Sequence, residues 1–170
     1  MSGRAATVRL LALDVDGVLT DGRLYYSNEG DEIKAFCIKD GLGIKLLQES
    51  GVKVAIITGR RSQIVERRAG ELGIEDIVQG REDKYDALLE LCSRLDLTPQ
   101  DCAYMGDDLP DLGAVKGCGL GMTVADGALQ LREAADWVST LPGGAGAVRE
   151  ACEHILEARG ALAAALAAFE

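Results

Sequence analysis

The sequence reads Val8-Arg-Leu-Leu-Ala-Leu-Asp-Val-Asp-Gly17 near its beginning. An apolar run, broken only by Arg9, stops at two aspartates that one residue separates. Such a run is typical of a strand buried on both faces of a parallel sheet. In extended backbone, residues i and i+2 face the same side, so we expect Asp14 and Asp16 to point into one pocket. Gly17 allows the chain to leave the strand sharply.

Similar apolar runs recur along the chain, at residues 52–57 and 102–105 and, more weakly, at 76–78, 119–124 and 136–138. Helix-like spacing of apolar residues separates them, over residues 41–50, 64–72, 83–95 and about 146–168. This alternation predicts an α/β fold, a Rossmann-like parallel sheet with helices on both faces. Ligands of such sheets bind beyond the carboxyl ends of the strands.

Residues 22–37 interrupt this alternation. They alternate with period two around the turn Asn28-Glu29-Gly30, which predicts a β-hairpin. The intervals from Asp16 to Thr58 and from Thr58 to Lys84 leave no room for a separate cap domain. The sequence contains no internal repeat and no linker, so we expect one domain over residues 1–170. Within it we expect the hairpin at about 22–37 and a C-terminal helix and tail at about 146–170.

The composition excludes several classes of function. With 18 basic and 28 acidic residues, the net charge of −10 disfavours nucleic acid and anionic membrane surfaces as partners. A single histidine, His154, excludes zinc sites built on several histidines and most Ser-His-Asp hydrolases. Five cysteines without a Cys-x-x-Cys pair suit a reducing compartment. No apolar run or leader is long enough for a membrane span or a signal peptide, so we expect a cytoplasmic protein.

Acidic residues gather after two of the predicted strands. Asp14 and Asp16 follow the first, and Asp107, Asp108 and Asp111 follow the run at residues 102–105. Crowded carboxylates are costly unless a cation compensates their charge, and oxygen ligands suit Mg²⁺. Either cluster alone has an alternative interpretation as turn and cap residues. Two clusters at two strand ends favour a metal site.

Other polar residues stand where a phosphoryl group would bind. Thr58 follows the run at residues 52–57, as a helix N-cap or as a phosphoryl contact. Lys84 lies near a helix start, where the helix dipole disfavours a cation, so it is either a surface lysine or a partner for phosphoryl oxygens. Arg60 and Arg68 would recognise a carboxylate or lie on a solvated, ion-paired face.

Together these residues resemble the motifs of the haloacid dehalogenase superfamily of phosphotransferases. The motifs read Asp14-x-Asp16, Thr58, Lys84 and Gly106-Asp-Asp-x-x-Asp111, in the family's order. Further segments resemble the branch of that superfamily that hydrolyses 3-deoxy-D-manno-octulosonate 8-phosphate, a sugar-acid phosphate of lipopolysaccharide precursor synthesis. These segments cover residues 14–22, 34–36, 39–41, 58–60, 106–109 and 143–150.

The resemblance implies a division of labour among the catalytic residues. Asp14 would be the nucleophile and form an aspartyl phosphate, and Asp16 would protonate the leaving oxygen and then activate water. Thr58 and Lys84 would hold phosphoryl oxygens. The expected activity is that of a phosphoric monoester hydrolase.

The resemblance also implies a magnesium site. Mg²⁺ would be held by the carboxylates of Asp14 and Asp107 and by the backbone carbonyl of Asp16. Asp108 and Asp111 would support these ligands from behind.

For the substrate, the resemblance implies a small anionic sugar-acid phosphate bound where subunits of a homotetramer meet, with the hairpins at its centre. The implied contacts, some from a neighbouring subunit, are Asp16, Lys39, Asp40, Gly41, Lys45, Gly59, Arg60, Arg68 and Lys84.

Three alternatives stay open on the sequence. The same chemistry would serve a nonulosonate 9-phosphate or a broad range of sugar phosphates. A phosphoacceptor receiver module also uses Asp, Thr and Lys on a parallel sheet, although its acceptor Asp ends a later strand. A non-catalytic scaffold on the same fold is disfavoured, because a scaffold has no reason to crowd carboxylates.

Overall fold

A computed structural model describes residues 2–169. At its centre lies a six-stranded sheet in the order β5-β4-β1-β6-β7-β8, in which every neighbouring pair is parallel. Its strands are β1 (Leu10–Leu13), β4 (Lys53–Thr58), β5 (Asp76–Gln79), β6 (Cys102–Gly106), β7 (Leu120–Thr123) and β8 (Trp137–Val138). Each apolar run of the sequence forms one of these strands, so the predicted parallel α/β sheet is confirmed.

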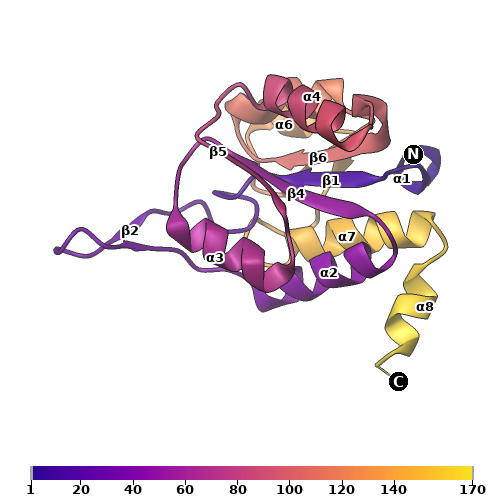
Figure 1. The fold of residues 1–170 in the computed structure, drawn as a ribbon, viewed down its shortest axis with the longest axis horizontal. Coiled ribbons are helices and arrows are strands. Elements are labelled where there is room, and N and C mark those ends of the chain that lie inside the picture. The colour runs from indigo at the N-terminus through magenta and orange to yellow at the C-terminus, as the bar shows by residue number, and fades with distance from the viewer. Residues whose placement is uncertain (1, 170) are drawn as a thin grey trace.

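Helices cover both faces of the sheet, as predicted (Figure 1). They are α1 (Ser2–Ala6), α2 (Ile38–Glu49), α3 (Gln63–Leu72), α4 (Lys84–Leu95), α5 (Leu112–Gly117), α6 (Leu129–Ala134), α7 (Ala147–Ala158) and α8 (Leu162–Ala167), with 3-10 turns η1 (Pro99–Asp101) and η2 (Leu109–Asp111). None of the described helices is both long and apolar enough to cross a bilayer.

The prediction of one last helix over residues 146–168 was wrong. The segment forms two helices, α7 and α8, joined at Gly160. Gly160 has φ of +68°, a left-handed conformation that ends α7. In Figure 1 the second helix turns away from the first towards the C-terminus.

Two clusters of buried apolar side chains lie on opposite faces of the sheet. Leu11 and Leu13 of β1 join the cluster under α2, α3 and α7. Leu10 and Ala12 join the other cluster, under α4, α5 and α6. Because β1 is buried on both faces, the residues that follow it are fixed at the centre of the sheet edge.

The predicted hairpin consists of β2 (Tyr25–Tyr26) and β3 (Glu32–Ile33), which pair antiparallel. It projects beyond the sheet in Figure 1, on the left. Its apolar side chains Leu24, Tyr25, Tyr26 and Ile33 are exposed. In the described chain the hairpin is the sole insertion between β1 and α2, and no separate cap follows it.

Candidate active site

A pocket of about 290 Å³ opens at the carboxyl ends of the central strands. Because β1 lies between β4 and β6, the residues that follow these three strands meet there. Its lining consists of Asp14, Asp16, Gly22, Leu24, Thr58, Gly59, Arg60, Glu82, Lys84, Asp107, Asp108, Pro110 and Asp111. The four motif positions, which the sequence spreads over about a hundred residues, therefore share one pocket.

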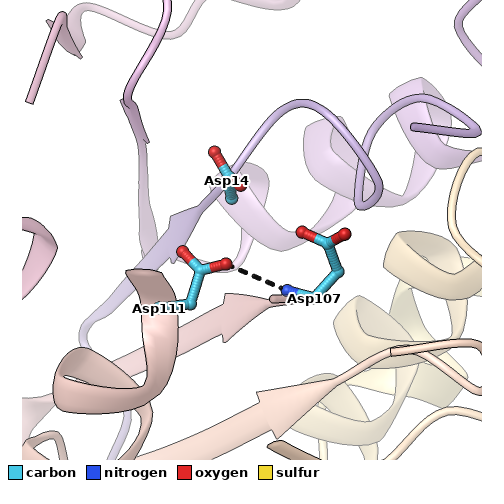
Figure 2. A group of neighbouring side chains, drawn as sticks. All are labelled: Asp14, Asp107 and Asp111. Atoms are coloured by element: carbon cyan, nitrogen blue, oxygen red, sulfur yellow. Dashed lines mark hydrogen bonds between the residues drawn. The ribbon is translucent and has the colours of Figure 1, made fainter. Parts of the chain in front are cut away.

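Three carboxylates that line this pocket lie close together (Figure 2). Oxygen atoms of Asp14, Asp107 and Asp111 all lie within 4.8 Å of one another. The backbone N–H of Asp14 donates to the carbonyl of Met105 at 3.0 Å, which holds the end of β1 against β6. The structure thus brings together carboxylates from both acidic clusters of the sequence.

This crowding changes the acidity of two of the carboxyl groups. Burial, together with the nearby carboxylate of Asp111, raises the pKa of Asp14 from 3.8 to about 7, although Lys84 opposes the change. Burial and the carboxylates of Asp14 and Asp111 raise the pKa of Asp107 to about 8. A hard cation would relieve this repulsion, and a set of carboxylate oxygens fits Mg²⁺. The residues present therefore suit the expected ion.

Lys84 is the first residue of α4 and is only 3% exposed. Its Nζ lies 3.0 Å from Oδ1 of Asp14 and donates to Oδ1 of Asp111 at 2.9 Å. Burial lowers the pKa of Lys84, but the two carboxylates raise it more. The alternative of a solvated surface lysine was wrong, and the paired carboxylates explain a cation at a helix start.

Asp111 has its oxygens fully engaged by protein donors. Besides Lys84, the hydroxyl of Tyr104 donates to it at 2.7 Å, and the backbone N–H groups of Asp107 and Asp108 donate at 3.1 and 3.2 Å. These bonds suit a residue that orients the acidic loop. The sequence analysis missed Tyr104, a polar group inside an otherwise apolar strand. Asp108 is exposed, and its carboxylate accepts from the N–H of Leu109 at 2.8 Å.

Thr58 is the last residue of β4 and is buried at the pocket. Helix α3 begins after Ser62, so the alternative of Thr58 as a helix N-cap was wrong. The backbone N–H of Arg60 donates to Oγ1 of Thr58 at 3.4 Å. Gly59 and Arg60 line the pocket beside it.

Asp16 is held from the hairpin side. Nζ of Lys34, which follows β3, donates to Oδ1 of Asp16 at 2.5 Å and lies 3.3 Å from Oε1 of Glu32. Nε of Arg60 lies 3.9 Å from Oδ2 of Asp16. The sequence analysis gave Lys34 and Glu32 no role.

The remaining predicted substrate residues lie elsewhere in the single chain. Asp40 is 1% exposed and accepts from the backbone N–H of Arg149 at 2.8 Å, at the start of α7. Gly41, Lys45 and Arg68 line a separate recess of about 240 Å³ between α2 and α3. Lys39 is exposed on α2. The described lining of the carboxylate pocket includes none of these residues.

A larger cavity, of about 880 Å³, lies along β5 between α3 and α4. Its polar lining includes the guanidinium groups of Arg61, Arg81 and Arg94. Arg81 is already paired with Asp83 at 2.7 Å and with Glu90 at 2.9 Å. Size alone does not make a reactive site, and we therefore take the smaller carboxylate pocket as the candidate active site.

Comparison with known proteins agrees with this geometry. A family model described as haloacid dehalogenase-like hydrolase matches residues 37–119. The chain is 46% identical over 159 residues to 3-deoxy-D-manno-octulosonate 8-phosphate phosphatase KdsC of Escherichia coli K12. The alignment covers 94% of this chain and 85% of that protein. At similar coverage, 92% and 83%, it is 48% identical to KdsC of Yersinia pestis.

A solved structure is similar over almost the whole fold. The 3-deoxy-D-manno-octulosonate 8-phosphate phosphatase of Moraxella catarrhalis, crystallised with magnesium, phosphate and KDO, has 49% identity and a TM-score of 0.98, covering 99% of this chain and 97% of that one. The cobalt-bound enzyme of Haemophilus influenzae has 40% identity and a TM-score of 0.90, covering 94% and 93%.

The fold, the carboxylate pocket and these matches define a haloacid dehalogenase-like hydrolase. Within that class, the chain belongs to the family of 3-deoxy-D-manno-octulosonate 8-phosphate phosphatases.

Proposed function

We propose that this chain is a Mg²⁺-dependent phosphatase that hydrolyses 3-deoxy-D-manno-octulosonate 8-phosphate to the free sugar acid and phosphate, in lipopolysaccharide precursor synthesis. One observation carries the proposal: three carboxylates converge beside the buried ammonium group of Lys84 at the ends of β1 and β6. The activity of relatives at 46–48% identity supports the choice of substrate.

In the proposed reaction, a carboxylate oxygen of Asp14 attacks phosphorus, and the bond from phosphorus to the sugar oxygen breaks. Asp16 donates its proton to the departing oxygen, which leaves as a hydroxyl group. Water then attacks the phosphorus of the aspartyl phosphate, Asp16 takes a proton from that water, and phosphate leaves with Asp14 restored. Thr58 and Lys84 would hold phosphoryl oxygens, where Lys84 already balances two carboxylates.

The carboxylates of Asp14 and Asp107 and the backbone carbonyl of Asp16 would hold Mg²⁺. When bound, the ion would supply positive charge near the phosphoryl oxygens, over which the transition state spreads its negative charge. Asp111 would keep the loop of Asp107 in place through the N–H groups that it accepts. Asp108 would support the metal site indirectly, because its carboxylate accepts from the N–H of Leu109 and caps the 3-10 turn η2.

For the sugar acid, we propose contacts from Asp16, Gly59 and Arg60 within the chain and from Lys39, Asp40, Gly41, Lys45 and Arg68 at a subunit boundary. The pocket is open to solvent, and water there would weaken discrimination between substrates. Exposed apolar side chains on the hairpin favour its burial by other subunits, so we propose a homotetramer. We further propose that residues 1–170 form one domain and that the protein is cytoplasmic, which its five free cysteines favour.

The test measures phosphate release from 3-deoxy-D-manno-octulosonate 8-phosphate, from nonulosonate 9-phosphates and from p-nitrophenyl phosphate, each with Mg²⁺ and with EDTA. We expect Mg²⁺-dependent turnover with the highest kcat/KM on the eight-carbon substrate. A higher kcat/KM on a nine-carbon substrate would keep the chemistry and reject the proposed substrate. A long-lived phosphoprotein without turnover would reject the enzyme.

A further inference from the structure

Lys34 is a buried cation that the reaction above does not use. Its side chain is 2% exposed, and its Nζ lies between the carboxylates of Asp16, at 2.5 Å, and Glu32, at 3.3 Å. Burying an ammonium group is costly unless it is paired. The pairing therefore links the hairpin, which carries Glu32 and Lys34, to Asp16, the third residue after the end of β1.

Lys34 is not placed to contact a substrate. The described lining of the carboxylate pocket includes Asp16 and Arg60 but does not include Lys34. Its ammonium group lies behind the Asp16 carboxylate, with Glu32 as its second partner. Its effect on a reaction in the pocket must therefore pass through Asp16.

The two oxygens of Asp16 have different surroundings. Oδ1 accepts from Lys34, the one hydrogen bond to this carboxylate within the described chain. Oδ2 has the more distant guanidinium of Arg60, at 3.9 Å between Nε and Oδ2. Asp16 lies after the end of β1, outside the strand, where the backbone ladder no longer restrains it. Lys34 thus fixes the rotation of the carboxyl group.

We propose that Lys34 is a positioning residue that holds Oδ1 of Asp16 and so presents Oδ2 to the oxygen of the leaving group. This inference rests on the proposed function, because it assigns Asp16 the proton transfers. Lys34 itself gives up no proton in either step. The hairpin is thereby part of the catalytic apparatus, in addition to any part that it has in assembly.

Arg60 and Tyr26 brace the same arrangement from the other side. Nη2 of Arg60 lies 3.5 Å from Oε1 of Glu32 and donates to the hydroxyl of Tyr26 at 3.3 Å. The loop after β4 and both hairpin strands are therefore tied to the pair of Asp16 and Lys34. Rotation of Asp16 would require this whole network to move.

The experiment uses the dependence of rate on the leaving group. An alkoxide needs a proton to depart, whereas p-nitrophenolate departs without one, so only the alkyl ester depends on the acid. We compare kcat/KM, because it covers the steps from free enzyme and substrate through transfer of the phosphoryl group, in which the leaving group departs. The variants are Lys34→Met, Lys34→Arg, Asp16→Asn and the double variant D16N/K34M, with Lys116→Met as an exposed-lysine control on α5.

For Lys34→Met we expect kcat/KM on the sugar-acid phosphate to fall on the order of 10²-fold, the loss typical of a misplaced catalytic group. On p-nitrophenyl phosphate we expect a change of less than about threefold. Lys34→Arg, which keeps a buried cation, should restore much of the alkyl-ester rate. In the Asp16→Asn background, Lys34→Met should cause no further loss, since both changes remove the same function.

Equal losses on both esters in Lys34→Met would overturn the proposal, because they would indicate a role in binding or folding. A further loss in the double variant would overturn it as well. Melting temperature and sedimentation of each variant show whether the fold and assembly survive, and Lys34→Arg provides the test if Lys34→Met does not fold. If the wild-type protein does not hydrolyse the sugar-acid phosphate, the proposed function fails. The role of Lys34 is then tested by comparing phenyl phosphate, which has the poorer leaving group, with p-nitrophenyl phosphate.

Discussion

Nζ of Lys84 lies 3.0 Å from Oδ1 of Asp14, which ties the first turn of α4 to the end of β1. The same ammonium group donates to Asp111, so one buried cation is shared by a carboxylate that faces the pocket and one that supports it. The Lys84 side chain therefore both offsets the negative charge of Asp14 and Asp111 and holds their carboxylates in position.

Lys84→Met should lose both activity and stability. Without the ammonium group, phosphoryl oxygens lose a charged donor, and we expect kcat to fall on the order of 10²-fold or more. The carboxylates of Asp14 and Asp111 lose their shared buried counter-ion, which costs about 3–5 kcal/mol of unfolding free energy. Steady-state kinetics and urea denaturation measure the two effects. Lys116→Met is the matched control, and normal turnover by Lys84→Met would contradict the assignment.

Asp14→Asn should abolish turnover and yet raise stability at pH 8 in EDTA. At that pH Asp14 is largely ionised with a pKa of about 7, in a site where burial and Asp111 oppose its charge. The neutral amide removes this opposition, so the melting temperature should rise. Mass spectrometry of the sample excludes deamidation back to aspartate. Retained turnover by intact Asp14→Asn protein would reject Asp14 as the nucleophile.

The metal-free protein should lose stability as the pH rises. Asp14 and Asp107 have pKa values of about 7 and 8 in the folded chain, above the value of 3.8 for an unperturbed aspartate. Between pH 3.8 and the raised pKa values, the folded state therefore holds more protons than the unfolded state. Its stability falls as the pH rises across this range, until both groups have ionised above about pH 8. Urea denaturation from pH 6 to 9 in EDTA measures this slope.

Mg²⁺ should oppose that loss, because bound metal replaces the protons on the carboxylates. The stabilisation by Mg²⁺ is therefore expected to grow from pH 6 to pH 9. Asp107→Asn, which removes the carboxyl group with the higher pKa, should flatten the slope seen in EDTA. An unchanged slope in Asp107→Asn would show that another group titrates.

Asp40→Ala should destabilise the chain by about 0.5–2 kcal/mol, the range for loss of a helix cap. The carboxylate accepts from the backbone N–H of Arg149 in the first turn of α7, and burial raises the pKa of Asp40. Chemical denaturation measures the loss, and Asp40→Asn, which keeps an acceptor oxygen, should lose less. A raised KM at unchanged stability would instead favour the substrate contact implied by the resemblance.

Much of the fold was predictable because each strand of the sheet contains a short apolar run, and because α3, α4 and α7 space their apolar residues with a helical period. The six-residue helices α5 and α6 were missed, because so few residues hardly complete two turns and show no period. The break between α7 and α8 was missed in an alanine-rich segment, although Gly160 offered a signal.

The pocket was predictable to the extent that its residues follow strands. Asp14, Thr58 and Asp107 each come directly after, or end, a strand, and parallel strands bring their carboxyl ends together. The pairing of Lys34 with Asp16 depends on how the hairpin folds back, and no spacing encodes it. The partner of Asp40 is 109 residues away, so its cap role is visible only in three dimensions.

The sheet order leaves β5 and β8 with one open side each. Such strands invite pairing with a strand of another molecule. β8 has only two residues, and β5 begins at Asp76, whose carboxylate lies 3.5 Å from Nη2 of Arg94. Short length and charge are the features that discourage edge-to-edge growth into aggregates. The outer strands of the sheet therefore disfavour intermolecular strand pairing in concentrated protein. The exposed hairpin remains as the strand pair that is available for specific contacts.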